Sequence, residues 1–161
     1  MGKKFLKYTL IAAVAVIALA ACVKNHTTVV NQIVADSVYE GTFYVDKSFS
    51  KDSTVIFLEF PDNSDKANIS LIAVRLSSSE TEFYTIGIEG LSYSATSSKI
   101  TLTGDNIVPT VSGEAKSDLT IKNFQATVDS NADPERIVFT MTMGTHEVSY
   151  TGALIYKKYI E

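Results

Sequence analysis

Cys22 is the only thiol in this chain of 161 residues, and its neighbours favour chemistry at its sulfur. It follows Ala20 and Ala21, whose small side chains let an enzyme approach the backbone closely. A cysteine thiolate is a nucleophile and can take a lipid group. A single cysteine excludes an internal disulfide and a zinc site built from several cysteines. The chemistry predicted for Cys22 is therefore covalent attachment of lipid.

The segment before Cys22 has the order of an export signal. Lysines among the first seven residues precede the apolar stretch Thr9–Ala21, which is 13 residues long. A permanent membrane-spanning helix needs about 20 such residues, so the shorter stretch favours a cleaved signal peptide. We expect residues 1–21 to be removed on export.

The four residues Leu19-Ala20-Ala21-Cys22 resemble the lipobox of bacterial lipoproteins, in which a branched apolar residue and two small residues precede the modified cysteine. The resemblance implies that Cys22 becomes the first mature residue and carries diacylglycerol and a further chain such as palmitate. Several acyl chains hold a protein stably on a bilayer, at about 0.8 kcal/mol per buried CH₂. The alternative is an ordinary signal peptide cut near Ala21.

The mature chain is acidic. Loss of the three signal lysines leaves 11 basic and 18 acidic side chains, a net charge of −7. Such a surface repels phosphate backbones, and no basic cluster with interleaved aromatic residues is present. Nucleic acid is therefore not an expected partner.

Residues 37–158 alternate between apolar and polar positions in short segments separated by turn residues, the pattern of half-buried strands. The segments lie at 39–45, 54–60, 67–76, 83–93, 99–103, 119–128, 137–143 and 147–156. We predict an all-β fold, an antiparallel up-and-down β-barrel of eight to ten strands, with a β-sandwich as the alternative. Residues 22–36 are then a lipidated tether.

Two segments give more detail. Leu119 and Ile121 are out of phase with the apolar residues from Phe124 to Val128, so a β-bulge near Lys122-Asn123 is predicted. The segments 137–143 and 147–156 read as a hairpin, because Gly144-Thr145 separates them. The second of them is predicted to place one row of residues inward: Val148, Tyr150, Gly152, Leu154 and Tyr156.

Aromatic residues on the inward faces are the candidate ligand-binding residues: Tyr39, Phe43, Tyr84, Phe124, Phe139 and Tyr150. The interior of a barrel of about eight strands is either filled by side chains or holds one small ligand. Tyrosine hydroxyls could orient an apolar or amphipathic molecule there.

Catalytic and metal-binding patterns are weak in this sequence. His146 is the only histidine outside the tether, and it lies at a predicted turn beside Glu147 without a nucleophile nearby. Asp129–Asp133 has the oxygen spacing that begins a calcium loop, but Pro134 and Thr140 replace the expected glycine and glutamate. We expect a solvated histidine and a polar loop, and hence no enzyme activity, metal or cofactor.

The order of these elements resembles the calycin-like (lipocalin-like) lipoproteins of Bacteroidota. The features that carry the resemblance are Cys22, the opening strand Tyr39–Phe43, the segment Asp118–Phe124 and the closing hairpin that ends at His146–Gly152. Gly41-Thr42-Phe43 stands where true lipocalins carry Gly-x-Trp. The resemblance implies a barrel with an apolar cavity and implies no activity.

We therefore expect a membrane-anchored, non-enzymatic barrel in the cell envelope, held at the outer membrane on its periplasmic or surface face. Its expected partners are the lipid bilayer, through acylated Cys22, and a small hydrophobic ligand. The alternative is a structural or interaction module that docks another envelope protein or a glycan through its loops.

Overall fold

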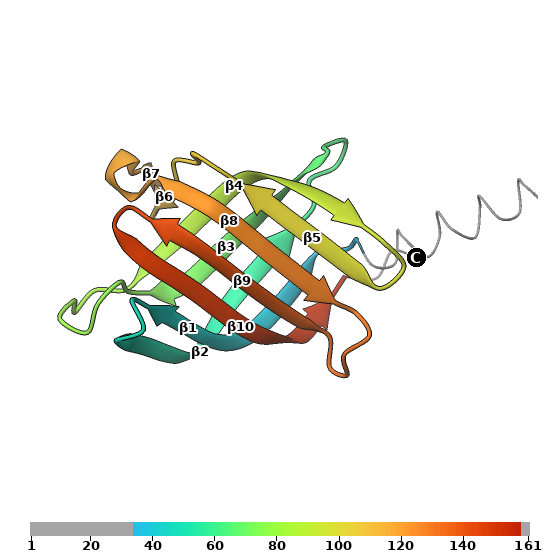
Figure 1. The fold of residues 1–161 in the computed structure, drawn as a ribbon, viewed down its shortest axis with the longest axis horizontal. Helices are drawn as coiled ribbons and strands as arrows, with labels where there is room; N and C mark the ends of the chain where they lie inside the picture. Colours follow the sequence, from blue (N-terminus) through green and yellow to red (C-terminus); the bar gives the residue numbers. More distant parts are fainter. Residues whose placement is uncertain (1–33, 159–161) are drawn as a thin grey trace, which may run out of the picture.

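The computed structural model describes residues 34–158, and these form one closed antiparallel barrel (Figure 1). Its elements are β1 (Ser37–Val45), β2 (Phe49–Glu59), β3 (Lys66–Val74), β4 (Tyr84–Ala95), β5 (Lys99–Gly104), β6 (Thr110–Val111), β7 (Glu114–Ala115), the 3₁₀ turn η1 (Ser117–Leu119), β8 (Ile121–Asp129), β9 (Arg136–Met143) and β10 (His146–Lys157). The strand order is β3-β2-β1-β10-β9-β8-β5-β4, and β3 pairs with β4 to close the ring. The predicted barrel is confirmed, and the alternative sandwich is not the fold.

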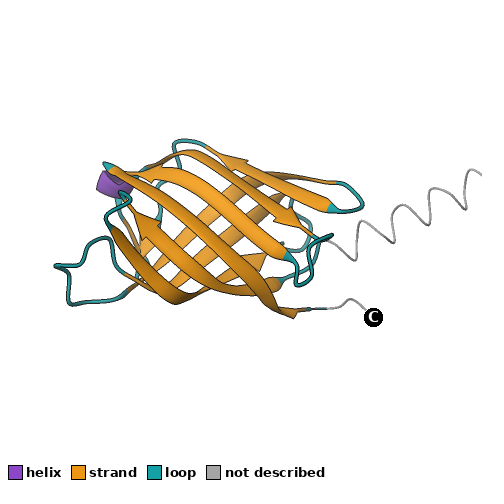
Figure 2. Cartoon of the chain, turned by 60° about the horizontal axis from the view of Figure 1, so that its bottom comes forward, coloured by secondary structure: helices purple, strands orange, loops and turns teal. Residues whose placement is uncertain are grey.

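The strands wrap around a single interior, which Figure 2 shows from a second direction. Strand β9 illustrates the alternation, since Ile137, Phe139, Met141 and Met143 are buried while the residues between them face outward. Successive side chains of a strand point to opposite faces, so one row of apolar residues fills the core and the other row meets solvent. The first strand of the hairpin β6–β7 pairs with the beginning of β4, on the same edge whose last residues pair with β5.

The bulge predicted in β8 is confirmed. The pairing of β8 with β9 shifts register between Lys122 and Gln125, and Asn123 has a φ of 52°. The extra residue lets both Ile121 and Phe124 point into the core. Leu119, predicted on the same face as Ile121, instead lies in η1 and is only partly buried.

The inward position predicted for Tyr156 is wrong. Tyr39 pairs with Leu154 but Val38 pairs with Tyr156, so Ile155 is an extra residue on β10. This bulge reverses the alternation: Tyr156 is 61% exposed and Lys157 points inward. Two adjacent apolar residues gave no sign in the sequence of where the phase would change.

The barrel has two distinguishable ends. Ser37 pairs with Lys157, so the described chain enters and leaves at the same end, which we call the entry end. The opposite end, here the far end, carries the β1–β2 turn, the long β3–β4 loop, the β9–β10 turn and the β6–β7 hairpin (Figure 1).

Candidate functional site

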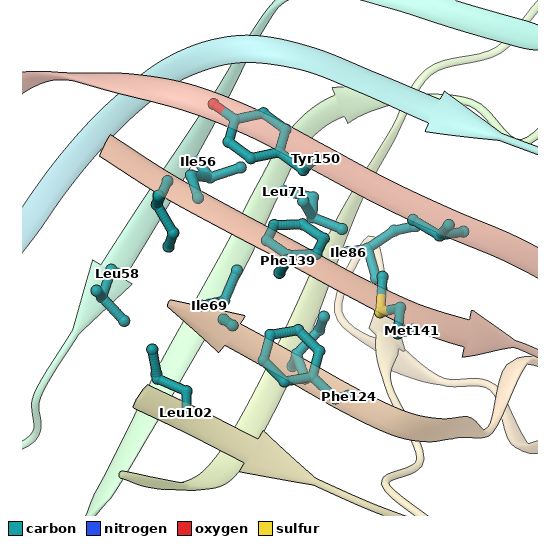
Figure 3. Packing of buried hydrophobic residues seen from close by; sticks show 14 of the residues in the cluster. Ile56, Leu58, Ile69, Leu71, Ile86, Leu102, Phe124, Phe139, Met141 and Tyr150 are labelled. Carbon is teal, nitrogen blue, oxygen red and sulfur yellow. The ribbon is translucent and has the colours of Figure 1, made fainter. Parts of the chain in front are cut away.

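Five of the six aromatic residues predicted to bind a ligand lie in the packed core. Tyr39, Phe43, Phe124, Phe139 and Tyr150 are each at most 1% exposed. They lie on four strands, β1, β8, β9 and β10, and belong to one core with the aliphatic rows of β2, β3 and β4. Figure 3 shows Phe124, Phe139 and Tyr150 among these aliphatic side chains. A ligand could contact them only if this packing opened.

The aromatic rings pack directly against one another. The centroids of Phe139 and Tyr150 are 5.2 Å apart with nearly parallel planes, and those of Phe124 and Phe139 are 5.5 Å apart. The Tyr150 hydroxyl donates to the carbonyl oxygen of Thr54 at 3.0 Å. Burial, and to a lesser degree the charge of Glu40, raises the pKa of Tyr150. The hydroxyl that could have oriented a ligand therefore already has a partner.

Two facing glycines allow close approaches that a side chain would prevent. Gly41 faces Gly152 across β1 and β10, and a Cβ on Gly41 would lie 2.0 Å from the carbonyl oxygen of Thr151, so this glycine lets the two strands come close together. A Cβ on Gly152 would lie 2.4 Å from the Tyr150 hydroxyl. The Tyr150 ring therefore occupies the space beside Gly152 that a side chain would fill.

Tyr84 behaves differently from the other five. It is partly buried and lines an open hollow of about 560 Å³ at the far end, together with Phe83, Val111 and charged side chains of the β6–β7 hairpin. A second open hollow, of about 330 Å³, lies near Tyr44, Asn123 and Thr140. Of the six predicted residues, only Tyr84 contributes to either hollow.

The entry end is closed by a buried polar cluster that the sequence did not indicate. Tyr39 donates to Glu135 Oε1 at 2.6 Å, and Ser130 donates to Oε2 at 2.7 Å. Lys157 Nζ lies 2.9 and 3.2 Å from the two carboxylate oxygens, and the side chains of this ion pair are only 7% and 9% exposed. Every oxygen of the carboxylate is thus satisfied, as a buried charge requires.

These contacts determine the ionisation of the cluster. Burial by itself would raise the pKa of Glu135, but the hydrogen bonds from Tyr39, Ser130 and Lys157 and the lysine charge lower it further than burial raises it. The pKa of Tyr39 is raised, first by burial and then by its hydrogen bond to Glu135. The cluster is therefore a carboxylate, an ammonium and a neutral phenol, which ties the β8–β9 loop to β1 and β10.

The far end carries an exposed aromatic and cationic group. The Arg75 guanidinium lies 5.2 Å from the ring centroid of Phe49 and 5.4 Å from that of Phe83, and Lys51 Nζ lies 5.9 Å from Phe83. Arg75 also donates to the carbonyl oxygen of Glu80, while its Nε is buried without a partner. Phe83 remains 54% exposed. We call Phe49, Arg75 and Phe83 the far-end stack.

Sequence reasoning missed the far-end stack. The available signal was an arginine and a phenylalanine at the two borders of the longest polar loop between strands. Neither a motif nor a periodicity shows that a loop folds back so that its borders meet, because only the pairing of β3 with β4 brings them together.

His146 lies at the rim of the far end. Its Nδ1 is 2.7 Å from Asp46 Oδ2, and the backbone N–H of Glu147 donates to Asp46 Oδ1. These two hydrogen bonds, that of His146 first, lower the pKa of Asp46. The contact joins two turns of the barrel, and His146 is one third exposed, as expected for a turn residue.

The last two features predicted from the sequence are the Asp129–Asp133 loop and Cys22. The Asp129–Asp133 loop uses Asp129 to accept from the backbone of Asn131. Within residues 34–158, no three His, Cys, Asp or Glu side chains gather closely enough to hold a metal ion. Residues 34–158 contain no helix that could span a bilayer. Cys22 lies outside the described residues.

Comparison with known proteins adds no relative. No family model, curated protein or solved structure matches this chain.

Proposed function

We propose that this protein is a lipid-anchored lipoprotein of the bacterial cell envelope whose barrel is a non-enzymatic interaction module acting through its outer surface and loops. The observation that carries the second half of the proposal is the filled interior, in which five inward aromatic residues are at most 1% exposed and pack on one another. A carrier of the kind implied by the calycin-like resemblance needs an empty volume at this place.

The anchor half of the proposal is supported by the order of lysines, apolar stretch and Leu19-Ala20-Ala21-Cys22. The position of the entry end agrees with it, since β1 begins at Ser37, only a short stretch after Cys22. An anchor there would leave the far end, with the far-end stack and the open hollow beside Phe83, directed away from the bilayer. A partner protein or glycan of the envelope would then meet the far end first.

A titration with an apolar fluorescent probe tests whether the interior binds ligands. The mature chain carrying Cys22→Ser is titrated with N-phenyl-1-naphthylamine, and we expect no saturable one-site binding at micromolar concentrations. The matched control is Phe139→Ala in the same chain, which opens an apolar cavity in the core of about the size of the lost ring and is titrated with benzene in place of the larger probe. Saturable binding by the chain with an intact core would support an internal carrier instead.

Acylation is tested by metabolic labelling with palmitate and by the intact mass of the mature protein. We expect the label and the acyl mass on the parent chain, and neither of them on Cys22→Ser, which should also leave the membrane fraction. An unacylated mature protein that starts at another residue would overturn the anchor.

A further inference from the structure

The outer face of the barrel carries an apolar patch at the entry end. Val38 on β1 pairs with Tyr156 on β10 and with Phe57 on β2, and directly opposed residues point to the same side of a sheet. Tyr156 is 61% exposed and Phe57 is 39% exposed. The bulge residue Ile155 adds a third large exposed side chain at 57%. We call Val38, Phe57, Ile155 and Tyr156 the entry-end patch.

The apolar surface extends from the entry-end patch to neighbouring outward residues of β2 and β3. Val55 pairs with Ile72, and both are partly exposed on the outward face. Contiguous exposed apolar residues on a small domain mark a surface that another apolar phase covers. Aromatic side chains are favoured at the boundary between water and lipid, where the ring is buried and polar groups such as the tyrosine hydroxyl remain hydrated.

The length of chain before β1 selects the occupant. Eleven residues separate Cys22 from Val34, and a fully extended chain spans at most about 3.3–3.6 Å per residue, so an anchored Cys22 keeps the entry end within roughly 40 Å of the bilayer. Tethering raises the effective concentration of the lipid surface at the patch, so even weak apolar contacts are populated. The other end of β1, at Val45, lies eight residues beyond Ser37 at about 3.3 Å each, so the entry end is the nearer of the two ends to the anchor.

We propose that the entry-end patch docks on the surface of the membrane that holds the anchor, so that the entry end of the β10–β1–β2 wall meets the bilayer with Tyr156 and Phe57 at the level of the lipid headgroups, and the far end points away from it. The inference rests on the proposed acylation of Cys22. Bilayer docking requires no specific partner groups, in agreement with a patch of rings and aliphatic side chains that line neither of the two hollows described above. It adds a second contact with the bilayer and so fixes the orientation that the anchor by itself only favours.

The absence of tryptophan from the chain makes the test direct. Tyr156→Trp places a single probe in the entry-end patch, and Tyr44→Trp is its matched control, because Tyr44 is 42% exposed on the outer face of β1 near the far end. Both mature lipidated variants are reconstituted into phosphatidylcholine vesicles with plain or dibrominated acyl chains. Bromine quenches only a tryptophan that reaches the acyl boundary.

We expect brominated lipid to lower the emission at position 156 by about half and to leave position 44 nearly unchanged. Phe57→Trp should follow position 156, since both belong to the same patch. Equal responses at 156 and 44 overturn the proposal. An unquenched tryptophan at position 156 also overturns the proposal. Size exclusion then shows whether a second copy covers the patch, and a blue-shifted emission without lipid shows that the chain's own residues before β1 cover it.

Failure of the anchor and failure of docking are separable. The mass of each variant is measured before reconstitution, and a mass without acyl chains rejects the anchor. An acylated protein with an unquenched tryptophan at 156 rejects only the docking of the patch.

Discussion

The two ends of the barrel use the same kinds of side chain in opposite ways. At the entry end, Lys157, Glu135 and Tyr39 are buried together and satisfy one another. At the far end, Arg75 lies against Phe49 and Phe83, and Phe83 remains half exposed. A charge that is buried with its counter-charge fixes loops to strands, whereas a cation covered by exposed rings remains near a surface where a partner can reach it. This difference predicts that the entry end contributes more to stability, and it agrees with the proposal that a partner meets the far end.

The sharpest way to break this comparison is to remove one cation from each end. Lys157→Met should lower the free energy of unfolding by about 3–5 kcal/mol, because Glu135 is left buried without its counter-charge. Lys116→Met removes an exposed partner of Glu114 at the far end and should cost less than about 1 kcal/mol. Urea unfolding followed by circular dichroism measures both. Similar losses for the two variants would contradict this prediction.

The hydrogen bond between Tyr39 and Glu135 should have the next largest effect. Tyr39→Phe keeps the ring in the core but removes the donor to a buried carboxylate, and should cost about 1.5–3 kcal/mol. Tyr84→Phe is the control, at the opposite end and only partly buried, and should stay within about 0.5 kcal/mol. Urea unfolding measures the stability of both variants. A Tyr39→Phe variant as stable as the parent would show that the hydrogen bond is dispensable.

Lowering the pH should also affect the stability of the two ends differently, but by less than the substitutions above. The folded-state pKa of Glu135 lies below its ordinary value of 4.5, so its ionised form stabilises the fold above that pH and the contribution is lost as the pH falls. The stability gap between the parent and Glu135→Gln, largest at neutral pH, should therefore narrow below pH 4.5. The corresponding gap for Asp46→Asn should narrow below pH 3.8 and be smaller throughout, because Asp46 is exposed to solvent. Urea unfolding of each variant between pH 7 and pH 3 measures these gaps. A gap between the parent and Glu135→Gln that stays constant over this range would contradict the predicted role of Glu135 ionisation.

The smallest expected effect on stability is at Phe83. Phe83→Ala removes a ring that is 54% exposed and its contacts with Arg75 and Lys51, and should cost less than about 1 kcal/mol. Phe43→Ala, in the core, should cost about 3–5 kcal/mol in the same assay. A large loss at Phe83 would make the far-end stack a structural feature and remove the reason to assign recognition to it.

Particular residues show how far sequence reasoning reached. The phase change between Ile121 and Phe124 predicted the bulge in β8, because a polar pair separates two rows of apolar residues that must both be buried. At Ile155 and Tyr156 the same kind of bulge gave no signal, because apolar residues occupy both phases. Of the six aromatic residues predicted to face inward, five are buried and Tyr84 is partly buried against the same core. Whether such residues line a cavity or fill it depends on how closely opposite walls approach.

The sequence by itself determined the all-β barrel, most of its inward rows and the hairpin at the carboxyl end. Each of these depends on order along the chain: alternation with a period of two and turn residues between segments. Only the tertiary structure decided that Glu135 meets Tyr39 and Lys157, that Arg75 meets Phe49 and Phe83, and that Tyr156 shares a surface with Phe57. The reason is that closure of the ring and the positions of its bulges set which distant residues become neighbours, and these depend on the register of all eight strands at once.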